Sequence, residues 1–157
     1  MFALRQLGIG CVLSAAWINL AFAGGFFLTL GNPSASGDPK ARDAFVTVRA
    51  DGCHMPSLAR ISGKAEGLVN GRRQSVPLKL TALSSKGVYA VRREWPADGV
   101  WVVSLSGSYL GRTTGAVIPV TPEGFQRELA KLFPRAPAEA DVEAALRAAA
   151  TSQVASR

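Results

Sequence analysis

One stretch of strict alternation constrains the fold of this chain more than any other feature. In ARISGKAEGLV, residues 59–69, small or apolar residues alternate with polar ones as far as Glu66. One face would carry Ala59, Ile61, Gly63, Ala65, Gly67 and Val69, and the other Arg60, Ser62, Lys64 and Glu66. Successive side chains of a strand point to opposite faces, so this period predicts a strand with one buried face. The small inner residues indicate that a bulky neighbour, such as a tryptophan, lies close to the backbone.

Turn signals separate this strand from several others. Asn70 and Gly71 both tolerate positive φ and predict a hairpin into the next strand, residues 74–83. Pro77 has no N–H to donate, which places that strand at the edge of a sheet. Other short apolar strands are predicted at 43–50, 88–95, 100–106 and 115–120. Together they predict an all-β antiparallel sandwich with Trp101 as its central buried aromatic residue.

The first 23 residues have the layout of a secretory signal peptide. Arg5 precedes an apolar run, and AFA at 21–23 forms a small-x-small end before Gly24. The run is short for a membrane span, which needs about 20 residues. Cleavage is therefore favoured over the alternative, retention as a membrane anchor. We expect a periplasmic or extracellular protein without a stable transmembrane span once residues 1–23 are removed.

The segment after the leader is expected to be a flexible N-terminal arm. Residues 24–42 begin apolar and become rich in Gly, Pro and Ser, which predicts little fixed structure from 31 to 40. GGFFLTL at 24–30 is either an extra strand or a continuation of the leader. The sandwich then occupies residues 43–120.

Composition changes again after the sandwich, and residues 121–157 predict a C-terminal helix followed by a frayed tail. The helix is expected over 121–133, with Thr121 as its N-cap. Its docking face would carry Phe125, Leu129, Leu132 and Phe133. Residues 138–157 have high helix propensity but a thin apolar stripe, made of Val142, Ala145, Leu146 and Ala149. That stripe predicts fraying rather than packing.

The charge balance bears on the partner of the protein. The chain has 18 Lys and Arg against 11 Asp and Glu, and Arg5 is the only charged residue of the leader. Such an excess favours an anionic cell-envelope component or an acidic protein. The arginines are scattered and no basic run is interleaved with aromatic residues, so nucleic acid is not expected as a partner.

The residues of the chain offer little for catalysis. His54 is the only histidine, and no serine nucleophile elbow, phosphate loop, CxxC or HExxH motif occurs. Cys53 is its direct neighbour, and adjacent side chains of an extended backbone point to opposite sides, so the two cannot form a nucleophile pair locally. The sequence therefore predicts a protein that is not an enzyme.

The stretch DGCHMPS, residues 51–57, contains the residues that could bind a metal. Cys53, His54 and Met55 suit Cu(I), which accepts soft sulfur and nitrogen ligands at low coordination number. Cys53 would be the only cysteine of the mature chain. It is then a free thiol, a metal ligand, half of an intermolecular bridge, or a small buried hydrophobic residue. The favoured interpretation is a loop without a cofactor, and Cu(I) is the alternative.

One segment resembles a known group of proteins. GVYAVRREWPADGVWVVSL, residues 87–105, is similar to the second half of small exported immunoglobulin-like domains such as the FixH and YtkA-like families. The residues that carry the likeness are Gly87, Tyr89, Pro96, Gly99 and Trp101, and it extends over about residues 44–120. The resemblance implies an Ig-like sandwich of about six to seven strands. FixH-type proteins serve the assembly of copper-containing oxidases and carry a membrane helix, whereas this chain has only the leader.

Two functions are consistent with these observations. The main hypothesis is a secreted or periplasmic, non-catalytic binding or accessory module whose partner is an unknown protein or an anionic cell-envelope component. The alternative is a periplasmic copper-handling protein that uses the loop Cys53–His54–Met55.

Overall fold

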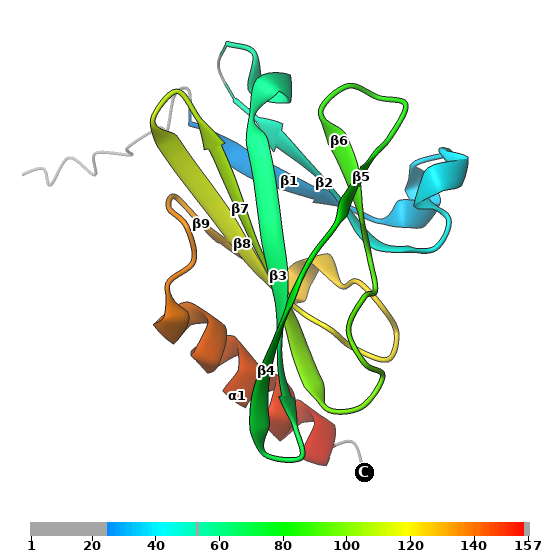
Figure 1. Ribbon diagram of the computed structural model, residues 1–157, viewed down its shortest axis with the longest axis vertical. Coiled ribbons are helices and arrows are strands. Elements are labelled where there is room, and N and C mark those ends of the chain that lie inside the picture. Colours follow the sequence, from blue (N-terminus) through cyan, green and yellow to red (C-terminus); the bar gives the residue numbers. More distant parts are fainter. Residues whose placement is uncertain (1–24, 53, 156–157) are drawn as a thin grey trace, which may run out of the picture.

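The computed structural model describes residues 25–52 and 54–155, and these form a β-sandwich with one helix packed on its outside (Figure 1). The first sheet has the order β1 (Phe27–Gly31), β2 (Ala44–Asp51), β6 (Val88–Arg92), β5 (Leu80–Ala82). The second has the order β4 (Arg72–Pro77), β3 (Arg60–Val69), β7 (Val100–Tyr109), β8 (Arg112–Pro119), β9 (Lys131–Phe133). All pairings are antiparallel, and the helix is α1 (Glu139–Ala155). The predicted all-β sandwich with a helical extension is confirmed, with nine strands among the described residues instead of six or seven.

The alternating stretch forms β3 as predicted, and its small residues accommodate a tryptophan. Gly67 lies directly opposite Trp101 of β7 in the sheet, and a Cβ on Gly67 would overlap the indole ring. Trp101 is only 2% exposed, and its Nε1 donates a hydrogen bond to the carbonyl of Asp98 at 2.7 Å. The expected central tryptophan is therefore confirmed, because the missing side chain of Gly67 makes room for its ring.

The Asn70-Gly71 turn also has the predicted form. The two residues have φ values of 49° and 74°, and they join β3 to β4. These angles fit the tight turn whose twist matches that of the flanking strands. A second turn of this kind, at Leu110 and Gly111, joins β7 to β8.

Residues 74–83 do not form the single strand that was predicted. Up to Pro77 they belong to β4, at the edge of one sheet, and from Leu80 they form β5, at the edge of the other. The chain crosses between the sheets at Leu78, whose N–H donates to the carbonyl of Gly63 at 3.0 Å. Pro77 ends the β4 pairing because it cannot donate to the ladder, which confirms its predicted edge position.

The flexible arm predicted for residues 24–42 is wrong, whereas an extra strand, one of the two alternatives for residues 24–30, is confirmed. Residues 27–31 form β1, which pairs with β2 and buries Leu28 and Leu30 in the core. Two short 3-10 helices follow, η1 (Pro33–Ala35) and η2 (Pro39–Ala41), each capped by an Asn or Asp side chain. Asp38 also accepts a hydrogen bond from the N–H of Ser84 at 2.6 Å. This bond and the one from the Lys40 N–H hold the pKa of Asp38 below its usual value. The Gly, Pro and Ser content thus encodes capped turns.

The helix predicted for residues 121–133 is wrong as well. Gly124 adopts a φ of 93°, and Thr121 to Gly124 form a turn closed by a 3.1 Å backbone hydrogen bond. A short 3-10 helix, η4 (Arg127–Leu129), leads into β9, which pairs with β8. The free edge of β8 offers a full set of hydrogen-bond partners, and this pairing replaces the predicted helix.

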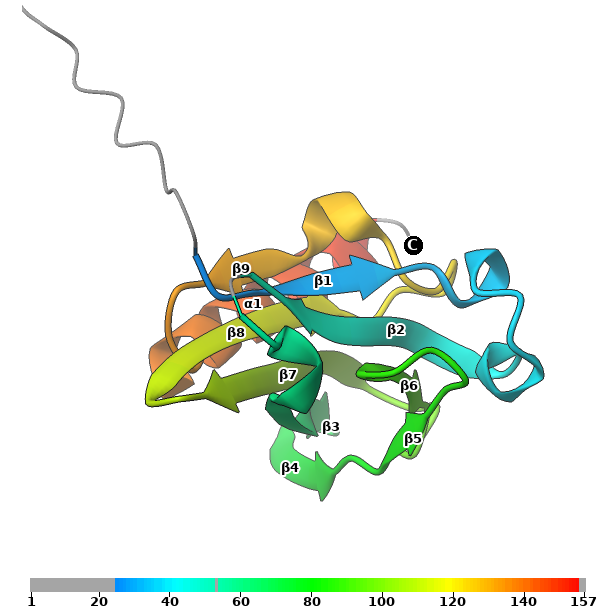
Figure 2. The ribbon, with the colours of Figure 1, turned by 90° about the horizontal axis from the view of Figure 1, so that it is seen from above.

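The tail that was expected to fray from residue 138 instead forms α1 over 139–155, so that prediction is wrong. Its thin stripe is sufficient, because Val142, Ala145 and Leu146 meet Val102 and Val117 on the outer face of the five-stranded sheet. The arrangement is seen from above in Figure 2. Polar contacts add to it: Arg73 of β4 binds Glu139 at 2.6 Å, and Asp141 accepts from the N–H of Ala138 at 2.7 Å.

None of the described helices is long and apolar enough to cross a membrane.

Glu66, expected on the exposed face of β3, is only 3% exposed. Its carboxylate binds Lys64 at 2.5 Å, Ser75 Oγ at 3.0 Å and Arg73 Nε at 3.2 Å. Burial by itself would raise the pKa of Glu66, but these three partners outweigh it and the pKa is lowered. A lowered folded-state pKa means that the charged form stabilises the fold above the unfolded-state pKa of about 4.3, and that this stabilisation disappears as the pH falls through the folded-state pKa.

Replacing Glu66 by glutamine should therefore destabilise the protein in a pH-dependent way. We expect Glu66→Gln to lower the free energy of unfolding by about 1–3 kcal/mol at neutral pH, because hydrogen bonds to a charged group are lost. The difference from wild type should shrink in strongly acidic buffer, where Glu66 is protonated. Urea denaturation at both pH values measures this. Glu143→Gln, at an exposed helix position, is the matched control, and a pH-independent loss in Glu66→Gln would contradict the expectation.

Candidate functional site

The loop predicted to bind metal joins β2 to β3 and ends in η3 (Pro56–Leu58). Cys53, the first of its three candidate ligands, lies outside the described residues. His54 and Met55 are both exposed, and they border a shallow pocket together with Asp51, Ser57 and Lys86, among others. Within residues 25–52 and 54–155, no group of three or more His, Cys, Asp or Glu side chains could hold a metal ion. Metal binding by this loop stays a prediction.

The backbone of the loop differs from the extended form assumed for it. His54 has a φ of 71° and Gly52 a φ of 137°, so the residues on both sides of Cys53 have positive φ. A Cβ on Gly52 would overlap the carbonyl oxygen of Gly25, which explains why glycine is required there. Gly52 and His54 are therefore not extended, and the rule that neighbouring side chains of a strand diverge does not apply to these two residues.

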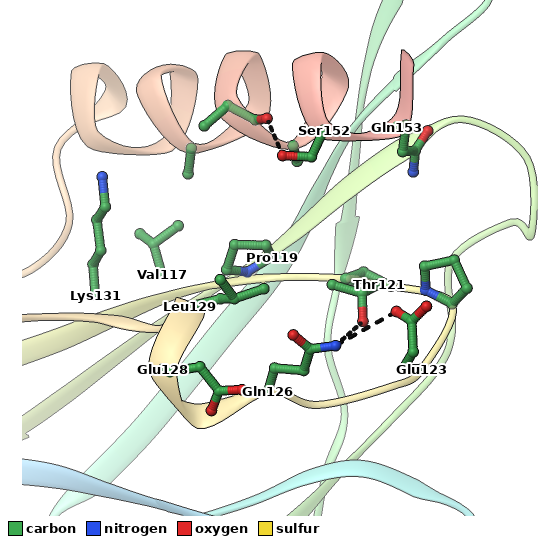
Figure 3. A pocket seen from close by; sticks show the side chains of 15 residues that line it. Val117, Pro119, Thr121, Glu123, Gln126, Glu128, Leu129, Lys131, Ser152 and Gln153 are labelled. Carbon is green, nitrogen blue, oxygen red and sulfur yellow. Dashed lines mark hydrogen bonds between the residues drawn. The ribbon is translucent and has the colours of Figure 1, made fainter. Parts of the chain in front are cut away.

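A larger and more apolar cleft lies between α1 and the segment that connects β8 to β9 (Figure 3). Its volume is about 480 Å³. One wall is the helix, and the other is formed by the end of β8 and by residues 120–131. The lining residues are Val117, Pro119, Val120, Thr121, Pro122, Glu123, Gln126, Glu128, Leu129, Lys131, Ala145, Ala148, Ala149, Ser152 and Gln153.

The helix wall is made of small side chains. Ala145 lies at the junction with the sheet, while Ala148, Ala149 and Ser152 continue the same face along the helix. Ser152 Oγ donates to the carbonyl of Ala148 at 3.1 Å and so turns its hydroxyl back onto the helix. Because Ala145, Ala148, Ala149 and Ser152 are small, the space between helix and connecting segment stays open along these residues.

The opposite wall is held in place by local hydrogen bonds. Thr121 Oγ1 donates to the carbonyl of Gly124 at 2.9 Å, and the side-chain amide of Gln126 donates to Thr121 Oγ1 at 3.4 Å. Arg127, in the same segment, donates to the carbonyl of Leu30 in β1. The first two bonds hold the connecting segment in its own turn, and the bond from Arg127 joins it to the sandwich.

Apolar side chains lie next to the helix in the cleft, and polar groups lie at its two ends and along its lower side. In Figure 3, Pro119 and Leu129 lie in the centre beneath the helix, Val117 and Lys131 stand at one end, and Glu123 and Gln153 stand at the other, with Glu128 and Gln126 below Leu129. Leu129 is partly exposed to the open space. Such an arrangement suits an elongated apolar molecule with a polar group at its end.

None of the cleft residues was predicted as a site from the sequence. Thr121 and Leu129 were assigned to a helix, and the alanines to a frayed tail. Gly124, three residues after Thr121, was the one available signal, because Thr-Pro-Glu-Gly is also typical of a turn. No local pattern indicates that 119–131 and 145–153 face each other, since this depends on where α1 docks.

Comparison with known proteins found no family model, no curated protein and no solved structure that matches this chain. The resemblance to FixH and YtkA-like domains stays a prediction.

Proposed function

We propose that this protein is an exported, non-catalytic binding module whose ligand occupies the cleft between α1 and residues 119–131. The apolar cleft of about 480 Å³ is the observation that carries the proposal. Ligand sites of small molecules have about 300–1,000 Å³ and are mostly apolar, with a few polar groups that orient the ligand. The cleft has this size and this distribution.

The shape and ends of the cleft favour a particular class of ligand. The apolar centre would hold a single hydrocarbon chain against Val117, Leu129 and the alanine face. Lys131, at one end, would pair with an anionic head group, which agrees with the overall positive charge of the protein. We therefore propose an amphiphile with one apolar chain and a carboxylate head, of the size of a medium-chain fatty acid.

Catalysis is not included in the proposal. The titratable groups among the lining residues are Glu123, Glu128 and Lys131, and the single histidine, His54, lies in a different loop. The carboxylate of Glu123 faces the Gln126 amide at 3.5 Å, which suits orientation of a ligand. Binding is the activity that these groups support best.

Filling the cleft should abolish ligand binding without disturbing the fold. We expect Ala148→Phe to weaken binding of decanoate at least tenfold, because the new ring would occupy the space of the ligand. Ala144→Phe carries the same change one turn earlier on the helix, at an exposed position outside the cleft, and should bind like wild type. Isothermal titration gives the affinities. A ligand that binds the native state also raises the melting temperature, which gives a second measurement.

Two results would contradict the cleft as a binding site. One is the absence of any decanoate binding by wild type at concentrations below those at which decanoate forms micelles. The other is an equal affinity of Ala148→Phe and Ala144→Phe. Either would leave the small side chains of α1 as a purely structural feature.

Export is proposed from the leader. Residues 1–23 would direct the protein to the periplasm or the exterior and would then be removed before Gly24. The intact mass of the protein recovered from the periplasm or medium checks this. A mass that still includes Met1–Ala23 in a membrane fraction would replace cleavage by anchoring.

Copper handling is the second candidate, and the loop backbone favours it. His54 has a positive φ, so it is not in the extended geometry that would send its side chain and that of Met55 apart, and both side chains are exposed to solvent. We expect the reduced protein to bind one Cu(I) per chain. Cys53→Ser should abolish binding, because a thiolate is the strongest of the three ligands, and Met55→Leu should weaken it modestly. Anaerobic competition with a chromogenic Cu(I) chelator measures this, and equal copper loss by wild type and Cys53→Ser would exclude the site.

A further inference from the structure

Several loops meet at one end of the sandwich, here called the apical end. It consists of the start of β1, the loop between β2 and β3, the loop between β5 and β6, and the hairpin turn between β7 and β8 (Figures 1 and 2). The rings of Phe26 and Tyr109 lie 6.3 Å apart and connect the start of β1 to that hairpin. Ser57 packs against Gly87 so closely that a Cβ there would clash, which connects the other two loops. Phe27 pairs with Asp51 and so joins these two pairs of segments into one surface.

Large apolar side chains project from this end into solvent. Of the seven exposed large hydrophobic residues in the described part of the chain, four lie here: Phe27, Met55, Leu58 and Leu110. Leu110 is 76% exposed and Met55 60% exposed. They come from three segments: Phe27 from the start of β1, Met55 and Leu58 from the loop between β2 and β3, and Leu110 from the β7–β8 turn.

Leu110 is the most informative of them. Its φ of 46° places it in the left-handed region, which is unfavourable for leucine and favoured by Gly, Asn or Asp. Its side chain gains nothing in the fold, because it points into water. Leu110 therefore has an unfavourable backbone conformation that burial of its side chain does not offset. This indicates a role outside the folded core.

Basic side chains surround these apolar groups. Arg49, Arg60, Lys86 and Arg112 are all exposed at the apical end. Asp51 is the only acidic residue within the described residues of 25–27, 49–60, 84–88 and 109–113, and Arg49 binds it at 2.7 Å. The apical end is therefore strongly positive around its protruding apolar side chains.

We propose that the apical end docks on the surface of a membrane that contains anionic phospholipids. Protruding apolar side chains within a basic collar match an interface in which hydrocarbon lies beneath negative head groups. Gly25 lies beside Gly52, so the start of the described chain belongs to this same end. This surface is separate from the cleft, and the proposal does not depend on a ligand there.

The proposal is tested by measuring how the protein recovered after export and processing binds to lipid vesicles. Vesicles of equal parts phosphatidylcholine and phosphatidylglycerol are compared with vesicles of phosphatidylcholine alone, and co-sedimentation gives the partition constant. Leu110→Asn should lower binding to the mixed vesicles by roughly tenfold, the equivalent of burying one leucine side chain. Arg60→Gln and Arg112→Gln should each lower it by roughly fivefold, and only on the mixed vesicles.

The controls separate membrane docking from a structural role. Asparagine accepts the backbone of position 110, so Leu110→Asn should melt at the wild-type temperature or above it. Leu68→Asn removes an exposed leucine near the opposite end of β3 and should leave vesicle binding unchanged. Equal binding of wild type to neutral and mixed vesicles would overturn the proposal. So would equal losses in Leu110→Asn and Leu68→Asn, and so would a concentration-dependent dimer that Leu110→Asn abolishes, because the apical end would then contact a second copy.

Discussion

Replacing Trp101 by alanine is expected to lower the free energy of unfolding by about 3–5 kcal/mol. The ring is buried between the sheets against the backbone of Gly67, and its Nε1 is bonded to Asp98. Removing it leaves a cavity that neighbouring strands cannot close. Because small domains have about 5–15 kcal/mol in total, Trp101→Ala should be close to unfolding at room temperature. Urea denaturation monitored by far-UV circular dichroism measures the loss.

Gly67 provides a sharper test of the same contact. Gly67→Ala alone should cost about 1–3 kcal/mol, because the new methyl group overlaps the indole ring. In the Trp101→Ala background the methyl group enters the vacated space, so the added cost should fall to near zero. Two residues in direct contact give such non-additive energies, whereas distant ones add. Additive losses, or an unchanged midpoint in Trp101→Ala, would mean that the ring does not lie over Gly67.

The second large effect is expected at α1. Leu146 is 5% exposed and belongs to the apolar cluster of α1 with Val102 and Val117. Leu146→Ala should therefore cost about 2–5 kcal/mol. The helix carries only a thin stripe, so this single change removes a large part of its attachment. We expect a loss of helical signal at lower urea concentration than the loss of the tryptophan signal from the core.

Arg147 is the matched control for Leu146. It is the next residue on the helix, it is exposed, and Arg147→Ala should change stability by no more than about 0.5 kcal/mol. Similar losses in both variants, or none in Leu146→Ala, would mean that α1 does not dock through its apolar stripe. The cleft would then lack one of its walls, so this result bears directly on the proposed ligand site.

The β-structure of the chain was predictable where neighbouring residues decide it. The alternation of residues 59–69, the Asn70-Gly71 turn and the edge position of Pro77 are all local properties, and the structure confirms them. Even the contact between small residues of β3 and a tryptophan could be predicted, since a run of small inner residues needs a large neighbour. Such features depend on strand geometry and turn chemistry alone.

The candidate site could not be predicted, because each of its walls depends on distant partners. Residues 121–133 have a helical pattern, but Gly124 turns the chain and the free edge of β8 recruits β9. The alanine-rich segment 139–155 has too few apolar residues to suggest packing, yet three of them suffice because they cover Val102 and Val117 on the outer face of the sheet. The strand in place of the helix and the helix in place of the frayed tail have the same cause. In both, an unpaired edge or an uncovered face of the sheet decides the structure, and the local pattern does not.

By itself, the sequence determined the antiparallel sandwich, its main turns and the burial of Trp101, because period-two alternation and positive-φ residues act within a few positions of the chain. Only the tertiary structure decided that residues 27–31 join the first sheet, that residues 74–83 divide between two sheets, and that α1 closes one side of an apolar cleft. These outcomes follow from the pairing of sheet edges and the covering of an exposed apolar face. Both bring together segments far apart in the chain, and no single stretch of sequence encodes them.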